Sequence, residues 1–205
     1  DRMADAFYRC TACKRCKLTC PMGIDHALVT HVARWALAEV GVVPKALAVS
    51  VREQLEGKTR NTSAIPGAAM KDTCEFLEEE LEEVYPGARI RFPIDVHGAE
   101  YVFFPAVSDY LLEAETLMGN AAVLHAMGAS WTIASANFDG IDYGLFYSDR
   151  MWERIVNAQV DAVHALGGKT MLIGECGHAS RAAREGMLNF VAPERRVPVL
   201  NIMEL

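Results

Sequence analysis

The pattern of apolar and polar residues divides the chain into a helical first part and a second part of alternating strands and helices. Residues 24–40 carry apolar side chains at helical spacing, and a second helix is expected from about Pro44 to Leu55. The polar residues 57–70 predict a turn-rich linker, and an acidic helix follows that ends at Tyr85. The apolar side chains of this helix that we expect to face inward are Phe76, Leu77, Leu81 and Val84.

From Arg89 onward, short apolar segments alternate with helical ones. Strands are expected at 100–104, 131–134, 169–174 and 197–202, and helices at 107–127, 148–166 and 179–190, with a loop through Tyr147. Short connections between such elements predict a parallel sheet covered by helices, and ligands gather beyond the carboxyl ends of its strands. Three loops should therefore converge there, at residues 104–106, 134–137 and 174–178.

One cysteine motif adds a specific chemistry to this pattern. Cys10, Cys13, Cys16 and Cys20 stand before Pro21 in the run Cys-x-x-Cys-x-x-Cys-x-x-x-Cys-Pro, the bacterial ferredoxin signature for a [4Fe–4S] cluster. A zinc site usually has two separated Cys-x-x-Cys pairs, and a disulfide framework needs a small secreted chain. We therefore expect these four thiolates to be the metal and cofactor ligands of a cluster that transfers single electrons.

Cys20 leaves two arrangements open. In two-cluster ferredoxins the last cysteine of the run binds the other cluster, yet here Cys74 and Cys176 are isolated. Either Cys20 closes a single cluster, or a second run lies upstream of Asp1. The chain starts inside an apparent helix and stops at Leu205, directly behind a strand, so a fragment of a longer protein with one or two clusters is expected.

Together these patterns predict an α+β fold in three segments. Residues 1–60 form a helical ferredoxin-like [4Fe–4S] domain, residues 61–88 a linker and the acidic helix, and residues 89–205 an α/β domain with a parallel sheet. A length of 205 residues suffices for one or two such domains.

Composition narrows the setting and the partners. The net charge of -7 argues against general nucleic-acid binding, and no apolar run is long enough for a membrane-spanning helix. Six cysteines, four of them in one motif, indicate a reducing compartment, so we expect the cytoplasm. Four basic residues surround the cysteine run: Arg9, Lys14, Arg15 and Lys17. They could raise the reduction potential of a cluster, dock an acidic electron donor or simply be solvated.

The order of these motifs resembles that of the heterodisulfide-reductase-like iron–sulfur proteins, which carry cysteine-rich "CCG" domains. Their first CCG pattern opens with Phe-Phe-Pro-Gly-Cys, whereas this chain has Phe-Phe-Pro-Ala at 103–106. Their Cys-Cys-Gly loop is replaced near 134–136, and the closing Cys-x-x-Cys survives only in part at 174–179, as Gly-Glu-Cys-Gly-His-Ala. This degenerate CCG-type domain is most similar to that of the DsrK-type, HdrD-like iron–sulfur proteins of the membrane Dsr complex.

The resemblance implies an oxidoreductase subunit of dissimilatory sulfur metabolism, peripheral on the inner face of the cytoplasmic membrane. Electrons would pass between a quinone-linked membrane partner of cytochrome type and a small protein that carries a disulfide or trisulfide. A second cubane cluster and the catalytic non-cubane cluster would use residues outside this chain. An iron–sulfur subunit of a flavin dehydrogenase, of the glycerol-3-phosphate or glycolate oxidase type, is the alternative, although those proteins generally retain the first CCG motif. An α/β binding domain with a structural zinc is a third possibility.

Candidate catalytic residues follow the strand at 169–174. Cys176 could be a reactive thiol or a ligand near a neighbouring cluster, or a buried structural cysteine. His178 could ligate a metal or bind a substrate, with Glu175 holding it, or it could be a polar helix cap. Asn137, Asp139 and Asp142 could line the same cleft, although turns are the simpler role. Core positions are expected for Trp35 and Trp152, and a core or a neutral surface position for Cys74.

Overall fold

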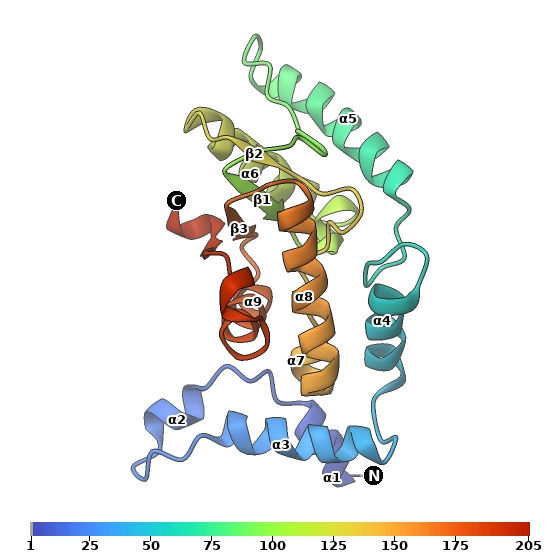
Figure 1. Cartoon of the computed structure of the whole chain (residues 1–205), viewed down its shortest axis with the longest axis vertical. Helices are drawn as coiled ribbons and strands as arrows, with labels where there is room; N and C mark the ends of the chain where they lie inside the picture. Colours follow the sequence, from blue (N-terminus) through green and yellow to red (C-terminus); the bar gives the residue numbers. More distant parts are fainter. Residues whose placement is uncertain (1) are drawn as a thin grey trace.

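The computed structural model describes residues 2–205, so the start of the chain at Asp1 lies outside the described residues. Within this range nine α-helices and four parallel strands give an α+β fold (Figure 1). The first five helices are α1 (Arg2–Tyr8), α2 (Arg15–Thr19), α3 (His26–Glu39), α4 (Lys45–Glu56) and α5 (Gly67–Val84). The helices expected near 24–40 and 44–55 are confirmed as α3 and α4, while α5 begins inside the predicted linker.

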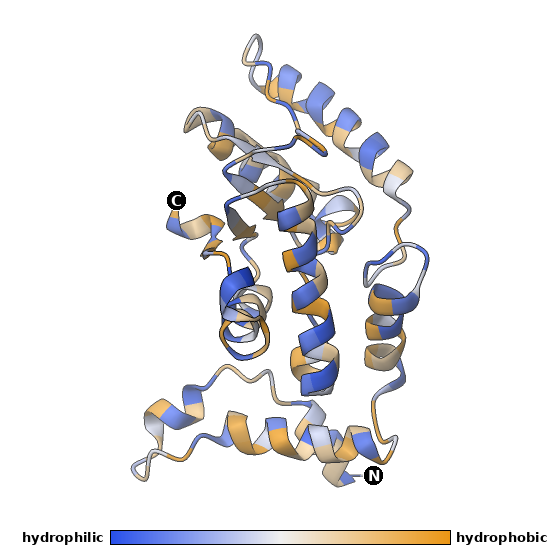
Figure 2. Cartoon of the chain, in the orientation of Figure 1, coloured by the Kyte–Doolittle hydropathy of each residue, from blue (hydrophilic) through white to orange (hydrophobic). Residues whose placement is uncertain are grey.

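Helix α3 turns its apolar stripe to the surface. Its buried residues are Ala27, Thr30 and Arg34, whereas Trp35, expected in the core, is 45 % exposed. The helix lies at one end of the molecule, where only one of its faces meets other elements, and its long apolar segment is visible in Figure 2. The spacing of apolar residues correctly predicts the helix. Which of its faces other elements cover depends on where the helix lies in the molecule.

The four strands are β1 (Tyr101–Phe104), β2 (Trp131–Thr132), β3 (Thr170–Ile173) and β4 (Val199–Asn201), in the order β2-β1-β3-β4. All three strand pairs are parallel, which confirms the predicted parallel sheet. The strand expected at 131–134 is shorter, because Ile133 makes only an isolated bridge to Ile94. Residues 102–104 of β1 and 171–173 of β3 are apolar and buried because both faces of these central strands are covered.

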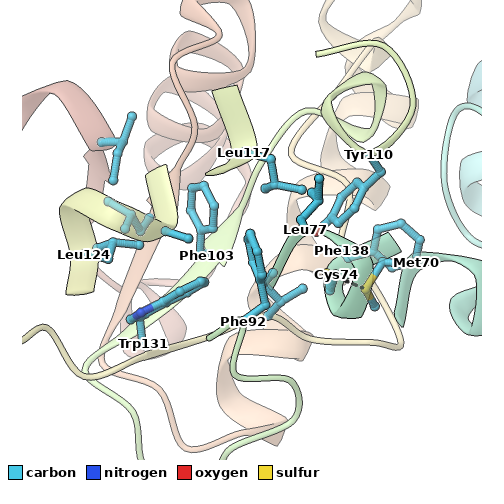
Figure 3. Packing of buried hydrophobic residues seen from close by; sticks show 14 of the residues in the cluster. Met70, Cys74, Leu77, Phe92, Phe103, Tyr110, Leu117, Leu124, Trp131 and Phe138 are labelled. Atoms are coloured by element: carbon cyan, nitrogen blue, oxygen red, sulfur yellow. Dashed lines mark hydrogen bonds between the residues drawn. The ribbon is translucent and has the colours of Figure 1, made fainter. Parts of the chain in front are cut away.

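Helices cover the two faces of the sheet in separate cores. Phe103 and Leu172 pack with residues of α5 and α6 (Ala114–Ala126), as Figure 3 shows for Phe103. Phe104 and Ile173, one position further along, pack on α8 (Asp149–Ala165) and α9 (Gly177–Phe190). This alternation is the consequence of the two-residue repeat of a strand.

Two predictions in these helices are wrong. The helix expected at 107–127 is divided into a short 3-10 helix, η1 (Val107–Tyr110), and α6, because Leu111 and Glu113 have non-helical dihedral angles. The expected loop through Tyr147 contains the short helix α7 (Gly144–Tyr147). The remaining 3-10 helices are η2 (Pro193–Arg195) and η3 (Ile202–Glu204).

The acidic helix α5 shows which apolar residues a helical stripe can bury. Leu77 and Leu81 are buried as expected, and they share one stripe with Cys74 and Met70 (Figure 3). Phe76 and Val84 are exposed, contrary to expectation. Phe76 lies to the side of that stripe, whereas Val84, three residues after Leu81, is the last residue of the helix. Trp152 is buried in the core as predicted, and Cys74, for which a core or a surface position was open, is buried as well.

Candidate functional site

The four-cysteine run forms an irregular loop between α1 and α3, and α2 lies within it. Two residues of this loop, Ala12 and Lys14, have left-handed backbone angles, with φ of 55° and 60°. Such angles are uncommon outside glycine and turn the chain sharply. All four thiols are free, those of Cys13 and Cys16 on the surface and those of Cys10 and Cys20 partly buried.

The chemistry of this donor set fits an iron–sulfur cluster. The amide of Ala12 donates to Cys10 Sγ over 3.4 Å, which is the kind of N–H···S contact that supports ligating thiolates. The backbone N–H of Arg15 and then the Thr11 side chain lower the pKa of Cys13, which favours the thiolate that binds metal. In residues 2–205 no three histidine, cysteine or carboxylate side chains are close enough together to hold a metal ion. The four cysteines therefore fit a cluster by the chemistry of their thiols and by their spacing in the sequence.

Contacts from two helices fix the cysteine loop. Arg34 of α3 donates to the Phe7 carbonyl over 2.6 Å and also to the carbonyl of Cys10. On the other side, Arg181 of α9 donates to the Ala12 carbonyl, and Lys14 pairs with Glu185 at 3.0 Å. Glu185 also accepts from Arg181 at 3.1 Å, so the loop is attached to the α/β part of the molecule.

The predicted convergence of loops at the carboxyl edge of the sheet is confirmed for the loops after β1 and β3, whereas the loop after β2 joins them mainly beyond the expected residues 134–137. The amide of Gly174 donates to the Phe104 carbonyl over 3.1 Å, and that of Gly140 donates to the Pro105 carbonyl over 2.7 Å. Ala106 and Ala134 are buried in the same core cluster. The loop after β2 thus meets the loop after β1 chiefly through Gly140, whose missing side chain allows the close approach.

Cys176 and His178 lie together at this edge. Helix α9 begins at Gly177, earlier than the expected Ala179, and Cys176 is its N-cap residue. Cys176 Sγ lies 4.0 Å from Nδ1 of His178, while Nε2 lies 2.9 Å from the carbonyl oxygen of Asp142. Because a carbonyl only accepts, Nε2 carries the proton and the lone pair of Nδ1 faces the thiol. Burial lowers the pKa of His178, which keeps the ring neutral.

Glu175 was expected to hold His178, but it does not. The carbonyl oxygen of Asp142 is the hydrogen-bond partner of Nε2 instead. The charge of Glu175 instead acts on Asp109, a buried residue that the sequence patterns did not single out. Burial first, and then this neighbouring charge, raise the pKa of Asp109 to about 7. Its Oδ2 atom has no hydrogen-bond partner among residues 2–205. Two carboxyl groups therefore lie near each other at the carboxyl edge of the sheet.

The two acids of the middle loop, Asp139 and Asp142, accept hydrogen bonds from nearby amides, and Asp139 also binds a residue distant in sequence. Asp139 Oδ2 accepts from the amide and hydroxyl of Thr62, each over 2.8 Å, and burial raises the pKa of Asp139 to about 6. Asp142 Oδ1 accepts from the amide of Gly144 over 2.9 Å. The bond to Gly144 shapes the turn that leads into α7, whereas the bonds to Thr62 connect the middle loop to the segment before α5.

Aromatic rings connect the two candidate regions, and the sequence patterns did not indicate them. The His178 ring stacks on Tyr143 and Phe146, with centroid distances of 5.2 Å and 4.8 Å. The guanidinium of Arg34 lies over Phe146, 5.2 Å from the ring centroid. A pocket of about 610 Å³ is lined by these residues and by Cys10. The structure thus brings Cys10 and His178 to the walls of one pocket.

None of the helices within residues 2–205 is both long and apolar enough to cross a membrane.

Comparison with known proteins gives two curated relatives, while no family model and no solved structure matches the sequence. The chain is 26% identical over 179 residues to an "Hdr-like menaquinol oxidoreductase iron-sulfur subunit" of Archaeoglobus profundus, covering 84% of the chain and 32% of that protein. It is 26% identical over 180 residues to "Hdr-like menaquinol oxidoreductase iron-sulfur subunit 2" of Archaeoglobus fulgidus, covering 85% of the chain and 32% of that protein. The chain therefore spans about a third of the length of these relatives. Both similarities support a relationship with the iron–sulfur subunits of Hdr-like oxidoreductases.

Proposed function

We propose that this chain is the cluster-bearing part of an electron-transfer subunit in a membrane-associated, Hdr-like oxidoreductase. The observation that carries the proposal is the compact run of four free cysteines, in a chain similar to iron–sulfur subunits over most of its length. Cys10, Cys13, Cys16 and Cys20 hold a [4Fe–4S] cluster, which supplies one-electron transfer when bound.

The residues around the run prepare the thiols for this role. The amides of Ala12 and Arg15 and the side chain of Thr11 favour negatively charged sulfur. The contacts of Arg181 and Lys14 hold the loop against α9, so the cluster is fixed next to the α/β domain. We assign residues 1–60 to a helical ferredoxin-like domain, 61–88 to a linker and helix, and 89–205 to a degenerate CCG-type domain.

The partners follow from the same resemblance. The relatives are named menaquinol oxidoreductase subunits, which supports a quinone-linked membrane partner, and from the family resemblance we propose that this partner is of cytochrome type. We propose a disulfide- or trisulfide-carrying protein of dissimilatory sulfur metabolism as the substrate, as in DsrK-type proteins, and a position on the inner face of the cytoplasmic membrane. The catalytic non-cubane cluster, and a second cubane if Cys20 binds one, use residues outside this chain.

Cys176, His178 and Glu175 are proposed as the residues of this chain that take part at the substrate side. The Nδ1 lone pair of His178 can accept a hydrogen bond from the thiol of Cys176, which polarises the S–H bond. The Asp142 carbonyl fixes the tautomer that this requires. Glu175 contributes negative charge at the same edge of the sheet.

Iron and sulfide analysis of anaerobically purified protein tests the cluster directly. We expect iron and acid-labile sulfide in the wild type and an EPR signal after reduction, with about four irons per chain if Cys20 closes a single cluster. Cys13→Ser should lose most of the iron because a ligand is removed, and Cys74→Ala, a change outside the run, should keep it. Zinc without an EPR signal on reduction, or equal iron in the two variants, would contradict the proposal.

A further inference from the structure

In the described part of the chain, Arg34 is a buried cation without a carboxylate partner. Its residue is 3 % exposed, and its guanidinium donates to the backbone carbonyls of Phe7 and Cys10. Within residues 2–205 no carboxylate forms an ion pair with Arg34. Burying an unpaired charge is costly, so a neighbouring negative charge is the expected compensation.

The other cations near the cysteine loop differ from Arg34 in their surroundings. Lys14 pairs with Glu185 at 3.0 Å, and Lys17 pairs with Asp25 at 3.6 Å, so their charges are compensated. Arg9 and Arg15 are exposed, where water and salt weaken their electrostatic effect. Among these cations of the described chain, Arg34 alone is both desolvated and unpaired, and a charge in such surroundings acts more strongly on its neighbours.

Two aromatic rings keep the guanidinium in place. Its central carbon lies 5.4 Å from the Tyr8 ring centroid and 5.2 Å from that of Phe146. The guanidinium fork bonds the Phe7 carbonyl through both Nε and Nη2. Lysine would keep the charge but could not reproduce this planar, doubly bonded contact.

We propose that Arg34 is the positioning residue whose buried charge stabilises the reduced state of the cluster at Cys10 and so raises its reduction potential. The inference rests on the proposed cluster. A cluster with four thiolate ligands is negatively charged, and reduction adds one more electron to it. A fixed cation that hydrogen-bonds the Cys10 carbonyl therefore stabilises the reduced form more than the oxidised form.

An EPR-monitored redox titration of the reconstituted full chain tests this role. Arg34→Gln, which removes the charge, should shift the midpoint potential to a more negative value. Arg34→Lys should stay near the wild-type value, because the charge is retained. The matched control is Lys169→Gln, which removes an exposed charge just before β3, at the opposite end of that strand from the Gly174 loop.

Iron content distinguishes the outcomes. An unchanged potential in Arg34→Gln, or an equal shift in Lys169→Gln, overturns the inference while leaving the proposed function intact. If Arg34→Gln loses the cluster and Arg34→Lys keeps it near the wild-type potential, the need for the charge is supported. If both variants lose the cluster, Arg34 serves only as a hydrogen-bonding support and the inference fails. A wild type that binds no cluster refutes both proposals.

Discussion

Individual buried side chains at the candidate site decide how the stability of this molecule depends on pH. Asp109 is the clearest case, since it lies 2 % exposed with one carboxylate oxygen unpartnered within the described residues. Burial and the charge of Glu175 make its ionised form unfavourable, which is why its pKa is raised to about 7. Such a group makes the stability of the fold depend on pH in a range where ordinary carboxyl groups are already ionised.

Asp109→Asn should remove this dependence. The native state keeps the Asp109 proton between pH 3.8 and about 7, while the unfolded chain loses it, so wild-type stability falls as pH rises through that window. One group contributes a slope of at most about 1.4 kcal/mol per pH unit. Urea unfolding at several pH values should show the variant gaining stability relative to the wild type as pH rises. A difference between the two proteins that is independent of pH would contradict this account.

The candidate-site residues differ in how far the sequence could predict them. The four cysteines follow from spacing alone, and Cys176 and His178 follow from their position after a strand. Arg34 and Phe146 could not be found in this way, because each acquires its role from a partner far along the chain. Trp35 shows the same limit, since an apolar residue at helical spacing does not reveal whether anything covers it.

At the scale of elements, the connections between strands and helices are the most restrictive about which residue can stand at a position. Gly140 illustrates this, because a Cβ atom there would lie 2.4 Å from the Phe104 carbonyl oxygen and 2.9 Å from that of Pro105. Both neighbours are backbone atoms at the end of the central strand β1. The loop and the strand can approach this closely only with glycine at this position.

Gly140→Ala is therefore expected to destabilise the fold. Forcing a methyl group against backbone costs about 1–3 kcal/mol or more, because β1 or the loop must move. The matched control is Gly119→Ala, at an exposed site on α6 with nothing within 4 Å of the added atom. That change should stabilise by about 0.5–1 kcal/mol, since alanine favours helix. Chemical denaturation compares the two, and equal stabilities would contradict the packing argument.

Most elements follow from the sequence because their apolar spacing agrees with the face that the fold buries. Helices α8 and α9 and the order of strands and helices are of this kind. The expected helix at 107–127 fails because periodicity continues across the turn at 111–113, while the chain there changes direction. Helix α7 is too short to leave a periodic signal, and it depends on the Asp142–Gly144 turn.

At the scale of the whole molecule, the cysteine loop and the α/β part form one connected structure. Glu185 on α9 is the link between them, because it accepts from both Lys14 and Arg181. Although its burial acts in the other direction, these two bonds lower the pKa of Glu185, which indicates that its ionised form is favoured in the fold. The position of the loop therefore depends on a residue distant in sequence.

Glu185→Ala should loosen the loop without unfolding the sheet. With both ion pairs removed, amides within residues 10–20 should exchange hydrogen a few-fold faster, because partly exposed pairs each contribute under about 1 kcal/mol. Hydrogen exchange measured by mass spectrometry should show no change in β1 and β3. Glu153→Ala, an exposed change on α8, is the control and should leave the loop unaffected. The same acceleration in both variants would show that α9 does not anchor the loop.

The half-exposed indole of Trp35, which lines a cavity together with Lys14, gives the molecule an optical reporter of its own. Of the three tryptophans, Trp131 and Trp152 are 6 % and 4 % exposed, whereas Trp35 meets solvent beside the cysteine loop. Long-wavelength emission thus comes from α3 alone. Any binding partner that covers this helix would shift that emission to the blue, so association can be followed in the unlabelled protein.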